Sequence, residues 1–341
     1  MSVKQISTNM LRGWIDGLLL QKTVIGPVQH QGHFRFESIT SSDQLALDYD
    51  VTDLPPKKFL LPPREVMMTF RSSGEFQSVM EFHPFVLFGV HPYDMIAINQ
   101  MDRVFSEKLV DIHYLTRRNA CSIVALDPVA VAPHNFSGCM GTATVEKGWD
   151  LLLTPLPQDG YLLEIGTEKG NTLLHSIYEL PDASLDQLQL REQRWNQNQK
   201  SMRRHELKCA PDDLPDLLEQ NYDHPLWQEK SSQCLSCGAC NIVCPTCYCF
   251  DIQDEVDWSL ETGVRCRAWD GCLLRDFAEV AGGHNFRKQS AERYRHRFYR
   301  KASYLPKRFG EIACVGCGRC ISACIPNISN PVEVYNQLVG E

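Results

Sequence analysis

The chain has 341 residues, 43% of them hydrophobic, and a formal net charge of −8. It is therefore long enough to bury a sizeable core and to form two or three domains. The mildly acidic balance argues against nucleic acid as a general partner, and the lack of any run of 18 apolar residues argues against a membrane-spanning helix.

The first 180 residues alternate between helical and strand patterns, which indicates an α/β domain. Ser7 is a suitable N-cap for a helix that continues through Leu18, with Met10, Leu11 and Trp14 at helical spacing. Buried or half-buried strands are predicted at 23–28, 32–39, 85–90, 122–126, 150–154 and 161–165.

A second helix is predicted at 95–105, with Asp94 as its N-cap. Ser184 begins a polar helix that reaches about Leu207 and that we interpret as a solvated linker. Short helices follow from Pro211 to Trp227. The predicted fold is α+β, with an α/β domain at 1–180, a helical linker at 181–210 and a mainly helical, ferredoxin-like module at 211–341 that contains an insertion at about 250–312.

The most specific pattern is a pair of cysteine runs, each of which reads C-x2-C-x2-C-x3-C. This is the bacterial ferredoxin spacing, in which thiolates hold a [4Fe-4S] cube and the fourth cysteine of each run binds the other cluster. Structural zinc sites instead use two cysteine pairs separated by a longer loop. The predicted ligands are Cys234, Cys237, Cys240 and Cys324 for the first cluster, and Cys314, Cys317, Cys320 and Cys244 for the second.

The chain contains 15 cysteines, so seven remain outside these runs. Cys247, Cys249 and Cys272, together with Cys139, have two interpretations. They are either buried thiols packed around a cluster, since free cysteine behaves as a small hydrophobe, or a further metal site that would hold a third cluster. Cys121 is expected in the core, and Cys209 and Cys266 are unassigned.

Cysteine abundance alone would indicate disulfides in a small secreted protein. The N-terminal residues lack the basic segment and apolar core of a signal peptide. Because the cysteines are spaced for clusters and no export signal is seen, we expect a reducing cytoplasm in an organism or condition low in oxygen.

The segment 287–308 carries nine basic residues and one acidic residue, Glu292. Such a segment can indicate nucleic acid or a membrane surface. We favour a different interpretation, in which the arginines stabilise the reduced state of nearby anionic clusters or face an acidic partner surface. The chain has no G-x-G-x-x-G motif after a strand and no P-loop motif, so it shows no nucleotide site of its own.

Several segments resemble an iron–sulfur subunit family shared by the β subunit of soluble sulfhydrogenases, which are NAD(P)-linked [NiFe] hydrogenases, and the corresponding iron–sulfur subunit of anaerobic sulfite reductase. The C-terminal half carries the specific likeness, and the N-terminal half departs from the family at His91, Tyr93 and 135–137. The matching segments are Cys234–Cys249, Trp269–Cys272, Ala281–Arg287, Cys314–Cys324, Val86–Asp94, Asp102–Phe105, Cys139–Thr142, Gly148–Thr154 and Gly166–Gly170.

The resemblance implies an electron-transfer subunit without a catalytic site of its own. Its partners would be a flavoprotein subunit that binds FAD and NAD(P)H and the catalytic subunits of a [NiFe] hydrogenase. A siroheme sulfite reductase subunit is the alternative catalytic partner. Two other functions stay open from the residues alone. One is an enzyme with a metal centre at Cys247, Cys249 and Cys272, and the other is an oxygen-sensing regulator whose basic helix binds DNA.

Overall fold

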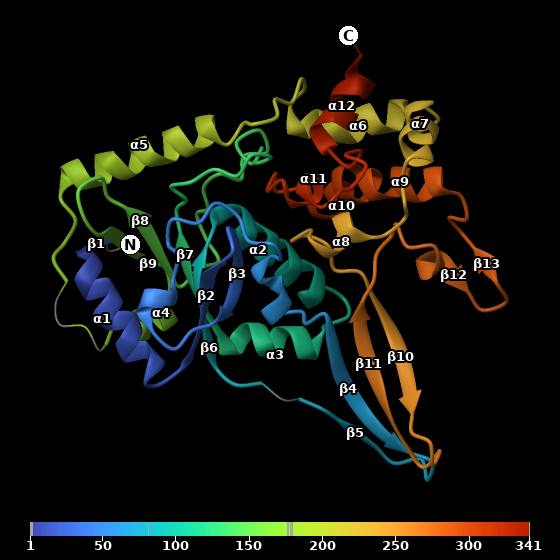
Figure 1. Cartoon of the computed structure of the whole chain (residues 1–341), viewed down its shortest axis with the longest axis horizontal. Helices are drawn as coiled ribbons and strands as arrows, with labels where there is room; N and C mark the ends of the chain where they lie inside the picture. Colours follow the sequence, from blue (N-terminus) through green and yellow to red (C-terminus); the bar gives the residue numbers. More distant parts are fainter. Residues whose placement is uncertain (1–2, 81, 176, 178–179, 341) are drawn as a thin grey trace.

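The computed structural model describes residues 3–80, 82–175, 177 and 180–340. The chain is a mixed α/β protein, with a seven-stranded sheet in the N-terminal half and mostly short helices in the C-terminal half (Figure 1). Each half buries its own apolar core. Among the helices within these described ranges, none is both long enough and apolar enough to cross a membrane.

The seven-stranded sheet has the order β1-β9-β8-β7-β6-β2-β3. Its four central strands run parallel, and the antiparallel strands β3, β9 and β1 complete it on either side. All six predicted strands are confirmed, with ends shifted by no more than two residues. The bounds are β1 Val3–Ile6, β2 Thr23–His30, β3 His33–Ser38, β6 Phe85–Val90, β7 Cys121–Leu126, β8 Leu151–Pro155 and β9 Tyr161–Ile165.

Helices cover both faces of this sheet (Figure 1). They are α1 Thr8–Leu19, α2 Pro92–Ser106, α3 Ile112–Ala120 and α4 Glu168–Leu173. Ser7 caps α1 as predicted, and Trp14 on the buried face donates its indole N–H to the Leu173 carbonyl at 2.9 Å. Met10 was expected on that face but is exposed, and Ile15 is buried instead.

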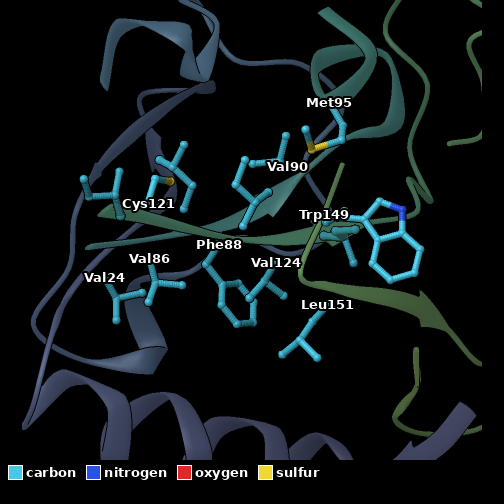
Figure 2. Packing of buried hydrophobic residues seen from close by; sticks show 14 of the residues in the cluster. Val24, Val86, Phe88, Val90, Met95, Cys121, Val124, Trp149 and Leu151 are labelled. Atoms are coloured by element: carbon cyan, nitrogen blue, oxygen red, sulfur yellow. The ribbon is translucent and has the colours of Figure 1, made fainter. Parts of the chain in front are cut away.

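A β-bulge interrupts strand β6 just before helix α2. The register of β6 against β7 shifts between Phe88 and Val90, and Gly89 between them has φ 80°. A bulge adds one residue to a strand and reorients the side chains that follow it. Figure 2 shows Val90 on the side of the sheet where Met95 of α2 lies, opposite Phe88. The strand therefore ends with Val90 facing α2, on the side of the sheet opposite Phe88 (Figure 2).

The predicted cap of α2 is wrong. Helix α2 begins at Pro92, three residues before the predicted start, and its N-cap is His91, which makes no side-chain capping bond. Proline is favoured in the first turn because it has no N–H to satisfy and its φ is already helical. Asp94 therefore lies inside the first turn, where its carboxylate is free to pair with another part of the chain.

A second sheet projects from the body of the molecule (Figure 1). It has the order β10-β11-β4-β5, so the inserted hairpin of the C-terminal half extends a hairpin of the N-terminal half. Its outer turns expose Phe76, Trp258 and Leu260. The strand bounds are β4 Arg64–Arg71, β5 Phe76–Ser78, β10 Phe250–Val256 and β11 Thr262–Trp269.

The C-terminal half begins with the polar helix α5, Leu185–Ser201, which Ser184 caps as predicted but which ends six residues before Leu207. The remaining elements pack around Tyr294, Phe298 and Tyr335. Their bounds are α6 Leu214–Gln220, α7 Leu226–Ser232, α8 Ala239–Ile242, β12 Glu279–Val280, β13 His284–Asn285, α9 Ser290–Tyr299, a π-helical turn Arg300–Tyr304, α10 Leu305–Phe309, α11 Arg319–Ser322 and α12 Pro331–Val339.

Short 3-10 turns connect some of these elements. They span Ser42–Gln44, Pro56–Phe59, Pro211–Asp213 and Asp276–Ala278. The division of the chain into the domains 1–180, 181–210 and 211–341 stays a prediction, because residues 134–142 of the first segment pack against the second cysteine loop.

Candidate functional site

The two cysteine runs form loops of the same shape. In each, two residues have positive φ: Ser236 at 50° and Gly238 at 71° in the first loop, Gly316 at 65° and Gly318 at 81° in the second. Gly238 and Gly318 are the N-caps of the four-residue helices α8 and α11, respectively. These left-handed turns fold the first three cysteines of a run around one point, and the short helix carries the fourth cysteine away.

The fourth cysteine of each run lies with the other loop. Cys244 and the second-loop residues Cys314, Cys317 and Cys320 line one cavity. In the reverse direction, the charge of Cys324 acts on Cys240, and Cys234, Cys240 and Cys324 all act on the buried hydroxyl of Tyr294. This arrangement is the exchange expected for two ferredoxin-type cubes. Cys237 is exposed on the first loop.

The donor chemistry fits bound metal. Burial raises the pKa of Cys240 and of Cys314 to about 12 and also raises that of Cys317 and Cys320. Thiols with such values are protonated at neutral pH, and only a bound cation of high charge would keep them as thiolates. The cysteines that could hold the two [4Fe-4S] clusters are the eight predicted from the spacing.

The second loop is buried against the N-terminal half. Arg319, which lies between two of its cysteines, forms a bidentate salt bridge with Asp94 of α2, at 2.7 Å for both bonds. The same guanidinium donates to the Thr52 carbonyl at 2.7 Å. The Thr142 hydroxyl donates to the Val315 carbonyl, also at 2.7 Å. Asp94 therefore anchors the second cysteine loop to the first sheet.

The glycines of the second loop make this approach possible. A Cβ on Gly316 would lie 2.5 Å from the Ser137 nitrogen, and one on Gly318 would lie 2.4 Å from the His134 carbonyl oxygen. No side chain fits at such distances without moving the backbone. In the first loop a Cβ on Gly238 would meet only a side chain, Leu274, at 3.0 Å, and Leu235 is 63% exposed. The two candidate cluster sites therefore differ in their access to solvent.

The remaining cysteines divide into two settings. The charge of Cys247 acts on both Cys249 and Cys272, and the Cys272 sulfur accepts from the Asn241 amide at 3.4 Å. The structure thus brings these three thiols into one region. It places the Cys139 sulfur elsewhere, 3.2 Å from the His205 carbonyl oxygen.

In the part of the chain that the structure describes, no three Cys, His, Asp or Glu side chains are close enough to hold a single metal ion. A cube is compatible with that spacing, because each of its cysteines binds a different iron. The further site at Cys247, Cys249, Cys272 and Cys139 stays a prediction. Cys121 is buried in the core as predicted, Cys266 accepts a hydrogen bond from Arg64 at 3.1 Å and Cys209 is half-buried.

Two arginines of the basic segment turn inward, and two cations near its end pair with carboxylates. Arg293 and Arg297 are buried, whereas Arg308 pairs with Glu107 at 3.1 Å and Lys307 pairs with Glu219. This distribution favours a role beside the clusters over a basic docking surface for an acidic partner. The composition of the segment indicated its charge, but only the packing of α9 identifies which cations are buried.

Three cations lie among the cysteine sulfurs. Lys301 donates to the Thr246 hydroxyl at 2.7 Å and lies beside Cys244. Burial alone would raise the pKa of Cys244, but Lys301, the Thr246 hydroxyl and Lys57 together outweigh it and leave that pKa below its usual value. Lys57, which sequence reasoning missed, is buried, and its ammonium group donates a hydrogen bond to the Cys247 carbonyl. The third cation is Arg297, which lines the cavity that the four second-site cysteines share.

Comparisons with known proteins agree with this geometry. Residues 233–328 match a family model described as a 4Fe-4S dicluster domain. The whole chain is similar to the protein named sulfhydrogenase 2 subunit beta from Pyrococcus furiosus, with 35% identity over 322 residues and 92% of each chain covered. Because this likeness includes the N-terminal sheet as well as the cysteine loops, the chain belongs to the iron–sulfur subunit family that includes the sulfhydrogenase β subunits.

Proposed function

We propose that the chain is an electron-transfer subunit of a cytoplasmic oxidoreductase complex. The observation that carries the proposal is the exchange of the fourth cysteine between two matching loops, which is the arrangement expected of two neighbouring four-sulfur sites. When bound there, [4Fe-4S] clusters would accept and release single electrons. The chain's own residues hold the sulfurs in place, cover the second site and supply compensating positive charge.

The difference in exposure between the sites supports the first site as the one that exchanges electrons with a partner. Leu235 and Cys237 of the first loop are exposed, and so is Ile325 after the second run, at 79%. In the second loop Val315 and Cys317 are buried beneath the N-terminal half. A partner's redox centre could therefore approach the first site closely, and we propose that this face meets another protein of the complex.

The partners we propose are those that the resemblance implies. A flavoprotein subunit would bind FAD and NAD(P)H, and [NiFe] hydrogenase subunits would carry out the catalysis. Similarity to a protein named as a sulfhydrogenase subunit favours hydrogenase over the alternative, a siroheme sulfite reductase. Identification of the subunits that co-purify with the chain would decide between the two.

The test replaces one proposed ligand of the second site, Cys317→Ala, in the assembled complex. We expect iron and labile sulfide to fall by about four atoms each per chain, because a [4Fe-4S] cube is lost. Hydrogen- or sulfite-linked NAD(P) turnover should fall to near zero, while dye reduction by the flavoprotein subunit persists. Cys121→Ala, at a core thiol, is the matched control and should retain turnover. Full NAD(P) turnover in Cys317→Ala would refute the proposal.

A further inference from the structure

We infer that two inward-facing cations of one helical segment set the reduction potentials of the two sites, with Arg297 acting on both and Lys301 on the second alone. This inference rests on the proposed function, because it assumes that the sites hold clusters. It adds what the cysteine pattern does not contain: the source of the positive charge that compensates the sulfurs, and a way in which the two potentials are linked.

The position of Arg297 is the main observation. Only 2% of this residue is exposed, and its Nη1 makes a single long bond, 3.4 Å, to the Ser329 carbonyl. Its Nε has no hydrogen-bond partner among the residues that the structure describes. A buried, incompletely bonded guanidinium is unfavourable unless negative charge lies nearby.

That negative charge comes from both loops. The sulfurs whose charge acts most strongly on Arg297 are those of Cys240 in the first site and of Cys320 and Cys244 in the second. Arg297 also lines the cavity that the four second-site cysteines share. It therefore lies between the two sites.

Lys301 follows Arg297 by four residues, and residues four apart lie on the same face of a helix. Its ammonium group donates to the Thr246 hydroxyl at 2.7 Å, and that hydroxyl donates to the Ala313 carbonyl at the same distance. The sulfurs that act on it are Cys244, Cys247 and Cys314. Both of the cluster cysteines in that set belong to the second site, and Lys301 lines the cavity that the second-site cysteines share.

Arg319 provides the contrast. It lies within the second loop, but its charge is neutralised by the bidentate pair with Asp94. Within the described ranges, neither Arg297 nor Lys301 lies within salt-bridge distance of a carboxylate. Their net charge is therefore available to stabilise an added electron. Coulomb interactions are strong where water is excluded, and cluster potentials depend on nearby charge and on hydrogen bonds to sulfur.

The experiment measures the potential of each cluster in the full chain, prepared anaerobically with its metal, by EPR-monitored redox titration. Arg297→Gln should make both clusters harder to reduce, with the equilibrium constant for one-electron reduction at least tenfold lower, which corresponds to a shift of about 59 mV. Lys301→Gln should shift the second cluster only. Arg297→Lys, which keeps the charge, should recover most of the Arg297→Gln shift.

Arg295→Gln is the matched control, because it removes a charge from the same helix but contacts Tyr222 and Asp223 rather than sulfur. Potentials in Arg297→Gln equal to those of the control would overturn the inference. If Arg297→Gln loses a cluster, Lys301→Gln becomes the deciding variant. An unchanged potential of the second cluster in Lys301→Gln would then overturn the inference. Absence of iron from the unmutated chain would instead refute the proposed function.

Discussion

The buried pair of Arg319 and Asp94 provides a sharp test of how the two halves are joined. Its two bonds are 2.7 Å long, and the side chains are 2% and 0% exposed. In Asp94→Asn the guanidinium loses its counter-charge and at least one of its two bonds, because the amide nitrogen cannot accept a hydrogen. Breaking a buried pair from one side costs about 3–5 kcal/mol. For a chain of this size, that corresponds to a fall in the unfolding midpoint of about 4–7 °C.

The exposed pair of Arg103 and Glu311 is the matched control. It also connects α2 to the C-terminal half, at 2.6 Å, but its side chains are 43% and 53% exposed. An exposed pair contributes about 0–1 kcal/mol, so Glu311→Gln should lower the midpoint by about 2 °C or less. Differential scanning calorimetry of the anaerobic protein measures both. An Asp94→Asn shift no larger than that of Glu311→Gln would refute the reasoning.

Two other substitutions test local features of the structure. Gly316→Ala should destabilise the second loop by about 2–4 kcal/mol, from strain at φ 65° and from the clash with Ser137. The control is Gly282→Ala, which has positive φ, 91°, but open space around it, so that it shares only the strain. Equal losses of thermal stability in the two variants would contradict the clash. Burial raises the pKa of Asp127 to about 6. The folded state therefore binds its proton more tightly than the unfolded state between about pH 4 and 6, and this contribution to stability is lost as the pH rises through 6. Asp127→Asn should gain stability relative to the unmutated chain between about pH 4 and 6.5, as measured by thermal melts, and a constant difference would exclude the raised pKa.

Local patterns were sufficient to predict much of the fold. Apolar runs predicted the six strands, and Ser7 and Ser184 marked the starts of two helices, because strand burial and helix capping depend on residues only a few positions apart. The same logic failed at Asp94. As a residue before an apolar run it is a suitable cap, but a partner 225 positions away in the chain holds its carboxylate.

The sequence by itself determined the chemistry of the site, because thiolate ligands of a cube are set by the spacing of cysteines within each loop. Tertiary structure alone decided which loop is buried, which arginines of a basic segment face sulfur and which carboxylate neutralises Arg319. Those outcomes depend on contacts between segments far apart in the chain, and neither composition nor periodicity records which distant groups meet when water is excluded.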